Sequence, residues 1–432
     1  MITSPAFAGK RYHVLGLART GQSVVAALRE SGAIVAAWDD REEARAEMPD
    51  DVEIVDPLET DVSRFDALVV SPGVPLNTHP LAGRAEAAGT PIIGDIELFA
   101  AARADLPPHR VVGITGTNGK STTTALIHHV IEAAGIPARL GGNIGAPILG
   151  TEPLPDGGIY VLELSSYQID LTQTLACEVA LLLNITPDHL DRYDGEMAKY
   201  AAAKARLFAM QDESGVAVIA GEDEWSRGVA DDHAANRADL ADDFAGGQAR
   251  WPALAGTHNR QNAVAAATAL RALGLSDDEI EAGFQSFGGL AHRMERIGEV
   301  GGVLYVNDSK ATNAESAAPA LTAYDRVHWI LGGRAKSGDL SPCEPYYGRV
   351  KAAYLIGEAA PLFNDALAGK VDRVLDCETL DRAVEAAANH AEAGDTVLLS
   401  PACASFDQFR DFEERGERFR SLVQDLAGGK AP

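Results

Sequence analysis

A glycine-rich stretch that follows a short apolar strand constrains this chain more than any other feature of its sequence. The stretch reads GITGTNGKSTTT over residues 113–124, between Val111-Val112 and the helix-like segment ALIHHVIEAAG. A strand, a glycine-rich turn and a helix that opens with Lys-Ser present backbone N–H groups and a helix N-terminus to an anion. The pattern predicts a phosphate-binding loop, in which Lys120 reaches the β- and γ-phosphates and Ser121 binds Mg²⁺.

The spacing of this loop departs from the usual phosphate-loop pattern G-x-x-x-x-G-K-[ST]. Ile114 stands where the first glycine is expected, and the glycines fall at positions 113, 116 and 119. The departure favours a variant class of phosphate loop over an ordinary GTPase or kinase. A turn without a ligand is the alternative, and the density of Gly, Thr and Lys argues against it.

The order of apolar runs and helix-like segments divides the chain into three α/β blocks. The first block contains YHVLGL and AIVAAW, the second contains the phosphate loop and IYVLELSSYQ, and the third contains VLYVND and DTVLLSPACAS. Apolar runs without alternation suit parallel strands buried on both faces, and alternating strands and helices imply doubly wound parallel sheets. Ligands are then expected beyond the carboxyl ends of the strands. Residues 221–256, which are acidic and rich in alanine, receive no assignment.

Charge and cysteine content limit the partners and the compartment. The formal net charge is −26, which argues against nucleic acid or an anionic membrane as a partner. The four cysteines form no CxxC pair, which favours reduced and mostly buried thiols. Neither a leader-like N-terminus nor an apolar run of about 18–20 residues is present, so we expect a cytoplasmic protein without membrane insertion.

Several residues of the second block are candidates for metal or phosphate chemistry. Glu163 ends an apolar strand downstream of the phosphate loop, and this position favours a Mg²⁺ ligand over a solvated strand-end carboxylate. His189, in NITPDHLDRY, could ligate a metal or serve as a hydrogen-bonded structural histidine, and the spacing leaves both open. Ser165 could bind phosphate or cap a helix. From its helix alone, Lys204 is interpreted as a surface lysine.

The two ends of the chain carry weaker signals. GLARTG resembles a dinucleotide fingerprint, but Ala18 replaces the glycine that permits close pyrophosphate approach. In the third block, Arg293, Lys310 and Lys336 lie near expected strand ends and could gather negative charge. Cys403 is interpreted as a buried thiol and not a nucleophile, because no His–Asp pair is apparent beside it.

Taken in order, the motifs identify a family resemblance over nearly the whole chain. GITGTNGKSTTT, LELSSYQ, LNITPDHLDRY, HNRQNA, HRME, NDSKATN and LLSPACASFDQFRDFEERG are similar to motifs of the Mur ligases of bacterial cell-wall synthesis. The last motif resembles the members that add D-glutamate. The phosphate loop and NDSKATN alone would specify only the superfamily, which includes folylpolyglutamate synthetases.

This resemblance implies a fold, a reaction and a set of partners. The fold would be α/β with three domains: a Rossmann-like domain for the UDP substrate (1–98), a central ATPase domain of the phosphate-loop type with a mostly parallel sheet that binds ATP and Mg²⁺ (99–289), and a Rossmann-like domain for the amino acid (290–432). The reaction would be ATP-dependent addition of D-glutamate to UDP-N-acetylmuramoyl-L-alanine through an acyl phosphate. We expect a monomer.

The resemblance also assigns site residues by motif. The catalytic residues would be Lys120, His189 and Lys204, with Lys204 carbamylated. The ATP contacts would be Gly116, Thr117, Asn118, Gly119, Lys120, Ser121, Thr122, Asn259, Asn262, Arg293 and Asp308. The Mg²⁺ ligands would be Ser121, Glu163, His189 and Lys204. The UDP substrate would contact Arg19, Thr20, Asp39, Asp40, Arg41, Ser71, Asn143 and Ser165, and His189 would also touch its muramoyl-alanyl arm. D-glutamate would contact Lys310, Thr312, Lys336, Ser405, Phe406 and Phe412.

Three alternatives remain on the sequence. A related ligase could use another acceptor, such as L-glutamate or a polyglutamate chain. An NAD-linked dehydrogenase could use the GLARTG turn, and a regulator could bind nucleotide without catalysis. Two departures from the family bear on the first alternative: the segment between Gly221 and Gly256 is short and atypical, and Phe406 stands where an aliphatic residue is expected.

Overall fold

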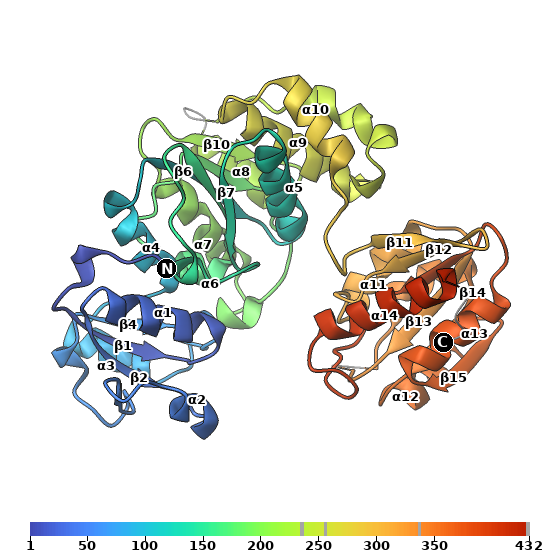
Figure 1. Ribbon diagram of the computed structural model, residues 1–432, viewed down its shortest axis with the longest axis horizontal. Coiled ribbons are helices and arrows are strands. Elements are labelled where there is room, and N and C mark those ends of the chain that lie inside the picture. Colours follow the sequence, from blue (N-terminus) through green and yellow to red (C-terminus); the bar gives the residue numbers. More distant parts are fainter. Residues whose placement is uncertain (234–236, 255–256, 336–337, 429–432) are drawn as a thin grey trace. The chain divides into compact units, whose positions relative to one another are not determined.

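In a computed structural model the chain folds into two compact units, and each unit is described by itself (Figure 1). The structure describes residues 1–233, 237–254, 257–335 and 338–428. The first unit comprises Met1–Trp251 and Thr257–Phe287, and the second comprises Pro252–Gly256 and Gly288–Pro432. Over these described ranges, the first unit contains two sheets and the second contains one.

The first sheet of unit 1 is a parallel five-stranded sheet in the order β3-β2-β1-β4-β5. Its strands are β1 Arg11–Leu15, β2 Ile34–Trp38, β3 Glu53–Ile54, β4 Ala67–Val70 and β5 Ile92–Ile93, and its helices are α1 Arg19–Glu30, α2 Glu42–Ala46, α3 Leu81–Ala88 and α4 Asp95–Ala102. The strand order reverses beside β1, between β2 and β4. In a doubly wound sheet this reversal is where the crevice for a ligand opens.

The second sheet of unit 1 carries the phosphate loop. It is parallel throughout, in the order β10-β9-β6-β8-β7. The strands are β6 His109–Thr115, β7 Ala138–Gly142, β8 Gly158–Glu163, β9 Val179–Leu182 and β10 Val216–Ile219. The helices are α5 Lys120–Ala133, α6 Ser166–Asp170, α7 Met197–Ala209, α8 Glu224–Asp232, α9 Thr257–Ala272 and α10 Asp277–Ser286. β6 is central and buried, as its apolar run predicts.

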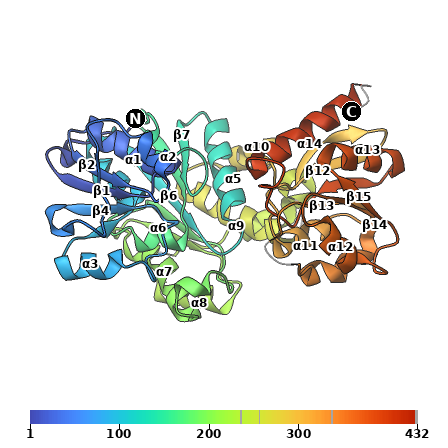
Figure 2. The ribbon, with the colours of Figure 1, turned by 90° about the horizontal axis from the view of Figure 1, so that it is seen from below.

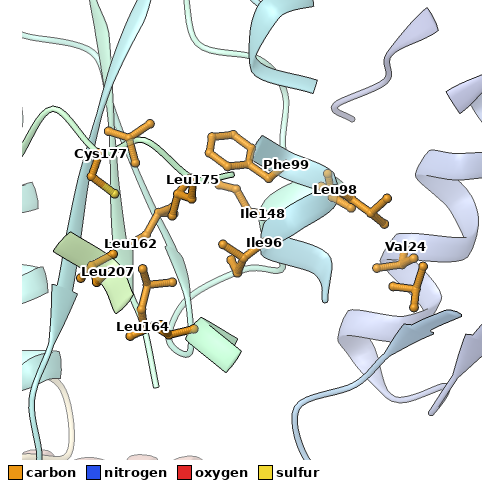
Figure 3. Packing of buried hydrophobic residues seen from close by; sticks show 14 of the residues in the cluster. Val24, Ile96, Leu98, Phe99, Ile148, Leu162, Leu164, Leu175, Cys177 and Leu207 are labelled. Carbon is orange, nitrogen blue, oxygen red and sulfur yellow. The ribbon is translucent and has the colours of Figure 1, made fainter. Parts of the chain in front are cut away.

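Helix α4 joins the cores of these two sheets. Its residue Leu98 points toward Val24 of α1, whereas Ile96 and Phe99 point toward Ile148 and the second sheet (Figure 3). All of these side chains belong to one continuous buried cluster. The predicted boundary between residues 98 and 99 falls inside this helix, and one hydrophobic core continues across it. The division into the first two predicted domains therefore stays a prediction.

The segment 221–256, which the sequence left unassigned, is mostly helical where it is described. It contains α8 and the 3₁₀ segment Asp242–Arg250. Trp251 is fully buried against Phe244 and Phe284, with ring centroids 6.0 and 4.9 Å away. Aromatic packing therefore anchors this segment to α10.

The sheet of unit 2 has six strands in the order β11-β12-β16-β13-β14-β15. The strands are β11 Glu295–Val300, β12 Val303–Asn307, β13 Val327–Gly332, β14 Val350–Ile356, β15 Val374–Glu378 and β16 Thr396–Leu399, and the helices are α11 Ala314–Thr322, α12 Ala360–Leu367, α13 Leu380–His390 and α14 Phe412–Ala427. The predicted doubly wound parallel sheet is confirmed for five of these strands, and at one edge β11 runs antiparallel to β12. Gly301 and Gly302, both with positive φ, make the tight hairpin that this pairing requires.

Helices cover both faces of this sheet, with α13 and α14 on one side and α11 and α12 on the other (Figure 2). Successive residues of β13 enter the two cores alternately: Trp329 and Leu331 pack with α11 and α12, and Ile330 packs with α13 and α14. Strand geometry causes this alternation. The carboxyl ends of β12, β13 and β16 consequently carry the third-block motifs at one edge.

Candidate functional site

The phosphate loop connects β6 to α5 and depends on its glycines. Gly119 has a φ of 84°, and a Cβ there would lie 2.3 Å from Oδ1 of Asn262. Asn262 and Asn259 are buried on α9, and the Asn262 amide donates to Oδ1 of Asn259 at 3.0 Å. Asn259 and Asn262, which are predicted to contact nucleotide, therefore lie beside the phosphate loop, although they are about 140 positions away from it in the sequence. Ser121 and Thr122 lie in the first turn of α5, with Ser121 buried.

The segment after β9 holds the phosphate loop in shape. The backbone N–H groups of Thr117 and Asn118 donate to the backbone oxygen and to Oδ1 of Asn184, both at 2.8 Å. The Asn184 amide in turn donates to the Asn118 carbonyl at 3.1 Å. Asn184 is the first residue of the NITPDHLDRY motif, but it was not among the predicted site residues. Its place in that motif is the sequence feature that could have indicated its role.

Two lysines converge on one carbonyl of the loop. Nζ of Lys120 donates to the Gly116 carbonyl at 2.9 Å, and Nζ of Lys204 donates to the same oxygen at 2.9 Å. Nζ of Lys204 also lies 4.5 Å from the centroid of the Tyr200 ring. The interpretation of Lys204 as a surface lysine from its helix is wrong, because the residue is only 1% exposed.

The environment of Lys204 changes its protonation. Burial and then the nearby charge of Lys120 lower the pKa of Lys204 to about 7, although Asp188 and Asp170 oppose the shift. A buried amine of this kind is largely neutral at a pH slightly above neutrality. The lowered pKa favours the neutral amine, which is the form that reacts with CO₂.

Glu163 ends β8 beside the predicted substrate residue Asn143. The Asn143 side-chain amide donates to Oε1 of Glu163 at 2.8 Å, and Glu163 is 1% exposed. Within the described residues, Oε2 of Glu163 is buried without a hydrogen-bond partner. A buried carboxylate oxygen without a donor fits a hard cation, so the donor chemistry suits Mg²⁺.

His189 lies in the loop between β9 and α7, in a left-handed conformation with a φ of 52°. Its ring packs against Tyr167 at 5.2 Å, and its Nε2 lies 3.5 Å from the carboxylate of Asp188. Among the described residues, no group of three or more His, Cys, Asp or Glu side chains forms a metal-binding cluster. A Mg²⁺ ion here would depend on phosphate and water oxygens for its remaining ligands, as Mg²⁺ commonly does.

Arg192 links this loop to the first sheet. Its guanidinium donates to the carbonyls of Gly73 and Val74, each at 3.0 Å, and stacks over Tyr167 at 4.4 Å. A cavity of about 130 Å³ lies between residues 72–77 and these side chains, with Asp170 in its wall. Neither Tyr167 nor Arg192 was among the predicted contacts.

Most of the predicted UDP contacts lie at the carboxyl ends of β1, β2 and β4, whereas Asn143 and Ser165 follow strands β7 and β8 of the second sheet. Arg19 and Thr20 open α1, and Asp39 and Asp40 follow β2. The Asp39 carboxylate accepts the backbone N–H of Leu17 at 2.7 Å. It also forms a 3.0 Å ion pair with Arg41. Partial burial would raise the pKa of Asp39, but these hydrogen bonds outweigh it and lower the pKa to about 2.

Two further predicted UDP contacts have visible structural roles. The Ser71 hydroxyl donates to the Gly16 carbonyl at 3.1 Å, which connects the ends of β4 and β1. Ser165 forms a capping box with Gln168 at the N-terminus of α6. Helix capping was one of the two possibilities left open for Ser165, and this contact confirms it.

The predicted nucleotide contacts of unit 2 surround the end of β12. Asp308 is buried, and its carboxylate accepts the Ser400 hydroxyl at 2.8 Å and the Met294 N–H at 3.1 Å. Burial raises the pKa of Asp308 to about 7. Arg293, the other predicted contact, precedes Met294 in the same loop.

The predicted D-glutamate residues include exposed and buried side chains. Nζ of Lys310 lies 3.8 Å from the centroid of the Phe412 ring at the start of α14. Ser405 is 2% exposed, whereas Phe406 is 63% exposed. Thr312 follows Lys310 in the loop before α11, and Lys336 lies outside the described residues.

Two neighbouring side chains complete this region of unit 2. The buried guanidinium of Arg415 donates to the Ser309 hydroxyl at 2.9 Å and to the Cys403 carbonyl at 3.0 Å. Burial raises the pKa of the Cys403 thiol to about 12, so this cysteine is a poor nucleophile, as the sequence indicates. All four cysteines are buried and free of disulfides.

Comparison with known proteins identifies the family to which these features belong. Residues 10–94 match the family "Mur ligase MurD-like, N-terminal domain", residues 114–251 match "Mur ligase middle domain", and residues 292–403 match "Mur ligase, glutamate ligase domain". A protein of Novosphingobium aromaticivorans named UDP-N-acetylmuramoylalanine–D-glutamate ligase is 59% identical, covering 99% of this chain and 97% of its own. A protein of the same name from Sphingopyxis alaskensis is 58% identical, and the match covers 99% of this chain and 100% of that protein.

A solved structure supports the fold. The UDP-N-acetylmuramate-alanine ligase MurC of Thermotoga maritima superposes with a TM-score of 0.59 at 15% identity, covering 96% of this chain and 99% of its own. At that identity the similarity supports the α/β fold alone. Identity of 59% and 58% over nearly the full length of two relatives is stronger evidence, and it shows that the chain belongs to the Mur ligase family.

Proposed function

We propose that this protein is an ATP-dependent ligase that joins D-glutamate to UDP-N-acetylmuramoyl-L-alanine in the synthesis of peptidoglycan precursors. The observation that carries the proposal is full-length identity of 59% to a relative with the corresponding name. The phosphate loop, with two lysines on the Gly116 carbonyl, supports the phosphoryl chemistry.

The reaction proceeds in two steps, transfer of a phosphoryl group to the substrate carboxylate and then transfer of the acyl group to the amine. An oxygen of the substrate carboxylate attacks the γ-phosphorus of ATP, the bond to the β-phosphate oxygen breaks, and ADP leaves. The neutral amine of D-glutamate then attacks the carbonyl carbon of the acyl phosphate. The tetrahedral intermediate loses a proton from nitrogen and expels inorganic phosphate, and an amide remains.

The described residues suit the first transfer. Two anions, a carboxylate and the γ-phosphate, must approach each other, so positive charge and N–H donors are needed where negative charge shifts. Lys120 at the N-terminus of α5 supplies the charge. A side chain at Gly119 would collide with Asn262, so glycine allows the loop to pack against α9.

Mg²⁺ is proposed as the metal cofactor. Glu163 and Ser121 would hold one ion, and His189 with carbamylated Lys204 would hold a second. Bound Mg²⁺ neutralises charge on the phosphoryl oxygens. The buried, unpartnered Oε2 of Glu163 is the feature among the described residues that favours this assignment.

The remaining site residues are assigned to the two other substrates. The cluster of Arg19, Asp39 and Ser71 at the strand reversal of the first sheet suits the UDP end, and Asn143 suits the muramoyl-alanyl arm. Lys310, Ser405 and Phe412 of unit 2 suit D-glutamate. The three domains would accordingly be residues 1–98, 99–289 and 290–432.

The surroundings in which the enzyme acts are also proposed. A net charge of −26 disfavours nucleic acid as a partner. Among the described helices, none combines the length and apolar composition needed to cross a bilayer. We propose a cytoplasmic enzyme that acts as a monomer.

Phosphate release from ATP tests the proposed function. The wild-type protein is assayed with Mg²⁺, ATP and UDP-N-acetylmuramoyl-L-alanine, without an amino acid and with D-glutamate, L-glutamate or L-alanine in turn. We expect release that requires both the UDP substrate and D-glutamate. Release independent of the UDP substrate would overturn the ligase, and preference for L-glutamate or L-alanine would overturn the acceptor.

Replacing Lys336 by Met separates amino-acid binding from nucleotide binding. Because Lys336 is assigned to D-glutamate, the Michaelis constant for D-glutamate should rise more than the constant for ATP. An equal rise in both constants would remove Lys336 from the acceptor site.

A further inference from the structure

The loop that presents Arg293 has an unusual backbone. His292 and Met294, on either side of Arg293, both adopt left-handed conformations, with φ of 62° and 48°. Left-handed backbone is costly for residues other than glycine and persists only when neighbouring contacts enforce it. The contacts around this loop therefore determine where the Arg293 side chain starts.

Several hydrogen bonds tie the loop to the start of β11 and to the segment that follows β12. The His292 N–H donates to Oε2 of Glu295 at 2.9 Å, and the Met294 N–H donates to Oδ1 of Asp308 at 3.1 Å. The backbone N–H of Lys310 donates to the His292 carbonyl at 3.0 Å. A shift of His292 would thus be transmitted to Lys310, the residue assigned to D-glutamate.

Asn307, the last residue of β12, lies beneath this loop with no exposed surface. Its Nδ2 lies 3.0 Å from Nδ1 of His292, 3.0 Å from Oε2 of Glu295 and 3.2 Å from the Gly416 carbonyl. Its Oδ1 accepts the Ser309 N–H at 3.2 Å. One side chain therefore connects the strained loop, β12 and α14.

The partners fix the orientation of this amide. Glu295 Oε2 and the Gly416 carbonyl can only accept hydrogen bonds, so the nitrogen of Asn307 must face them. The same NH₂ group also faces His292 Nδ1, and because an amide nitrogen accepts no hydrogen bond, Nδ1 carries no proton. The imidazole proton accordingly lies on Nε2, whose carboxylate neighbour is Glu417 at 3.5 Å.

We propose that Asn307 is a positioning residue for the ligase reaction, because it holds the His292–Met294 loop and α14 in register and so sets the places of Arg293, Lys310 and Phe412. The inference rests on the proposed function. Asn307 acts through these neighbours and is not assigned to any substrate.

Gly416 provides an independent way to disturb the same contact. A Cβ at Gly416 would lie 2.1 Å from Nδ1 of His292. Gly416→Ala removes no polar group, yet it must displace the imidazole from Asn307. Asn307→Ala instead removes the amide and leaves His292, Glu295 and the Gly416 carbonyl without their shared donor.

A control variant separates positioning from stability. Tyr354 is fully buried in β14, and its hydroxyl is hydrogen-bonded to His328 at 2.9 Å. His328 is the second residue of β13, so this hydrogen bond lies toward the amino end of that strand and away from its carboxyl end. Tyr354→Phe therefore removes a buried hydrogen bond of the same unit. Thermal melts of all variants show how far each one is destabilised.

Steady-state kinetics of phosphate release, with each substrate varied in turn, test the inference on the full-length protein. For Asn307→Ala and Gly416→Ala we expect kcat/KM for D-glutamate and for ATP to fall by about ten- to a hundredfold, the range for loss of a buried hydrogen-bonding partner. Calorimetric affinity for UDP-N-acetylmuramoyl-L-alanine, whose assigned contacts lie in unit 1, should stay within about twofold of wild type.

The outcomes are distinct. Wild-type constants for D-glutamate in both variants would overturn the inference, and so would an equal loss in Tyr354→Phe at a similar melting temperature. If Asn307→Ala does not fold, Gly416→Ala decides, because it retains every hydrogen-bonding group. A wild-type protein without D-glutamate-dependent turnover would instead refute the proposed function.

Discussion

Replacement of Lys204 tests the part of the site that departs most from ordinary lysine chemistry. An ammonium group has no lone pair for a metal, whereas a carbamate has anionic oxygens suited to Mg²⁺. The neutral amine adds CO₂ and releases one proton, so the reaction depends on the neutral fraction. Lys204→Ala and Lys204→Arg should both lose activity, because neither side chain forms a stable carbamate.

The structure supplies the magnitude of the effect. Burial and the charge of Lys120 lower the pKa of Lys204 to about 7. At pH 7.5 a substantial fraction of the amine is then neutral, compared with about one molecule in a thousand for an ordinary lysine. Loss of a group that supports metal binding typically costs about 10- to 100-fold in activity, which is the minimum decrease expected for both variants.

Phosphate release in buffers freed of CO₂, with and without added bicarbonate, is the assay. Wild-type activity should fall when CO₂ is removed and return with bicarbonate, whereas both variants should remain inactive in either buffer. Mass spectrometry of the intact protein under gentle conditions should detect added CO₂ on wild type only. A fully active Lys204→Arg variant would refute the carbamate.

The same pKa predicts an effect on stability in CO₂-free buffer. Since the folded-state pKa lies below the unfolded value of 10.5, the buried charge destabilises the fold below pH 7, and this cost disappears as the pH rises from about 7 to 10.5. A shift of this size corresponds to roughly 5 kcal/mol as an upper figure. Lys204→Met should therefore resist urea better than wild type at pH 6, and the advantage should shrink toward pH 10. A constant difference across this range would contradict the lowered pKa.

Three further substitutions test the phosphate loop and the acidic strand end. Lys120→Ala should reduce kcat by about 10²–10³ without changing the melting temperature by more than a few degrees, and turnover within a few-fold of wild type would exclude its role. Gly119→Ala should weaken ATP binding, measured by calorimetry, because its Cβ would lie 2.3 Å from Oδ1 of Asn262; unchanged affinity would show that Asn262 moves aside freely. Glu163→Gln should raise the Mg²⁺ concentration for half-maximal activity, and an unchanged titration would remove Glu163 from the metal site.

Local patterns made much of the fold predictable. The phosphate loop, strands β1 and β2, and strands β12 and β16 of the third block lie where apolar runs and glycine turns place them. The antiparallel strand β11 was not predicted, because its residues Glu295–Val300 are half-exposed and lack an apolar run. An edge strand of this kind is recognised by its partner more than by its own composition.

The site was predictable where a motif marks it and not where packing creates it. From its helix alone Lys204 has the pattern of a surface lysine, and only the family resemblance indicated otherwise. Its burial comes from the contact of α7 with the Gly116 carbonyl, 88 residues away in the chain. Asn307 depends in the same way on the Gly416 carbonyl, 109 residues away. Such roles follow from tertiary contacts that spacing within a motif does not encode.

Oxygen transfer during turnover tests the central claim most directly. UDP-N-acetylmuramoyl-L-alanine labelled with ¹⁸O in both carboxylate oxygens is converted with ATP and D-glutamate, and the released phosphate is examined by mass spectrometry. Attack by the carboxylate on ATP and loss of phosphate from the tetrahedral intermediate predict one ¹⁸O atom in each phosphate and one in the new amide. Unlabelled phosphate, released at the same rate with and without D-glutamate, would contradict both the acyl phosphate and the ligase.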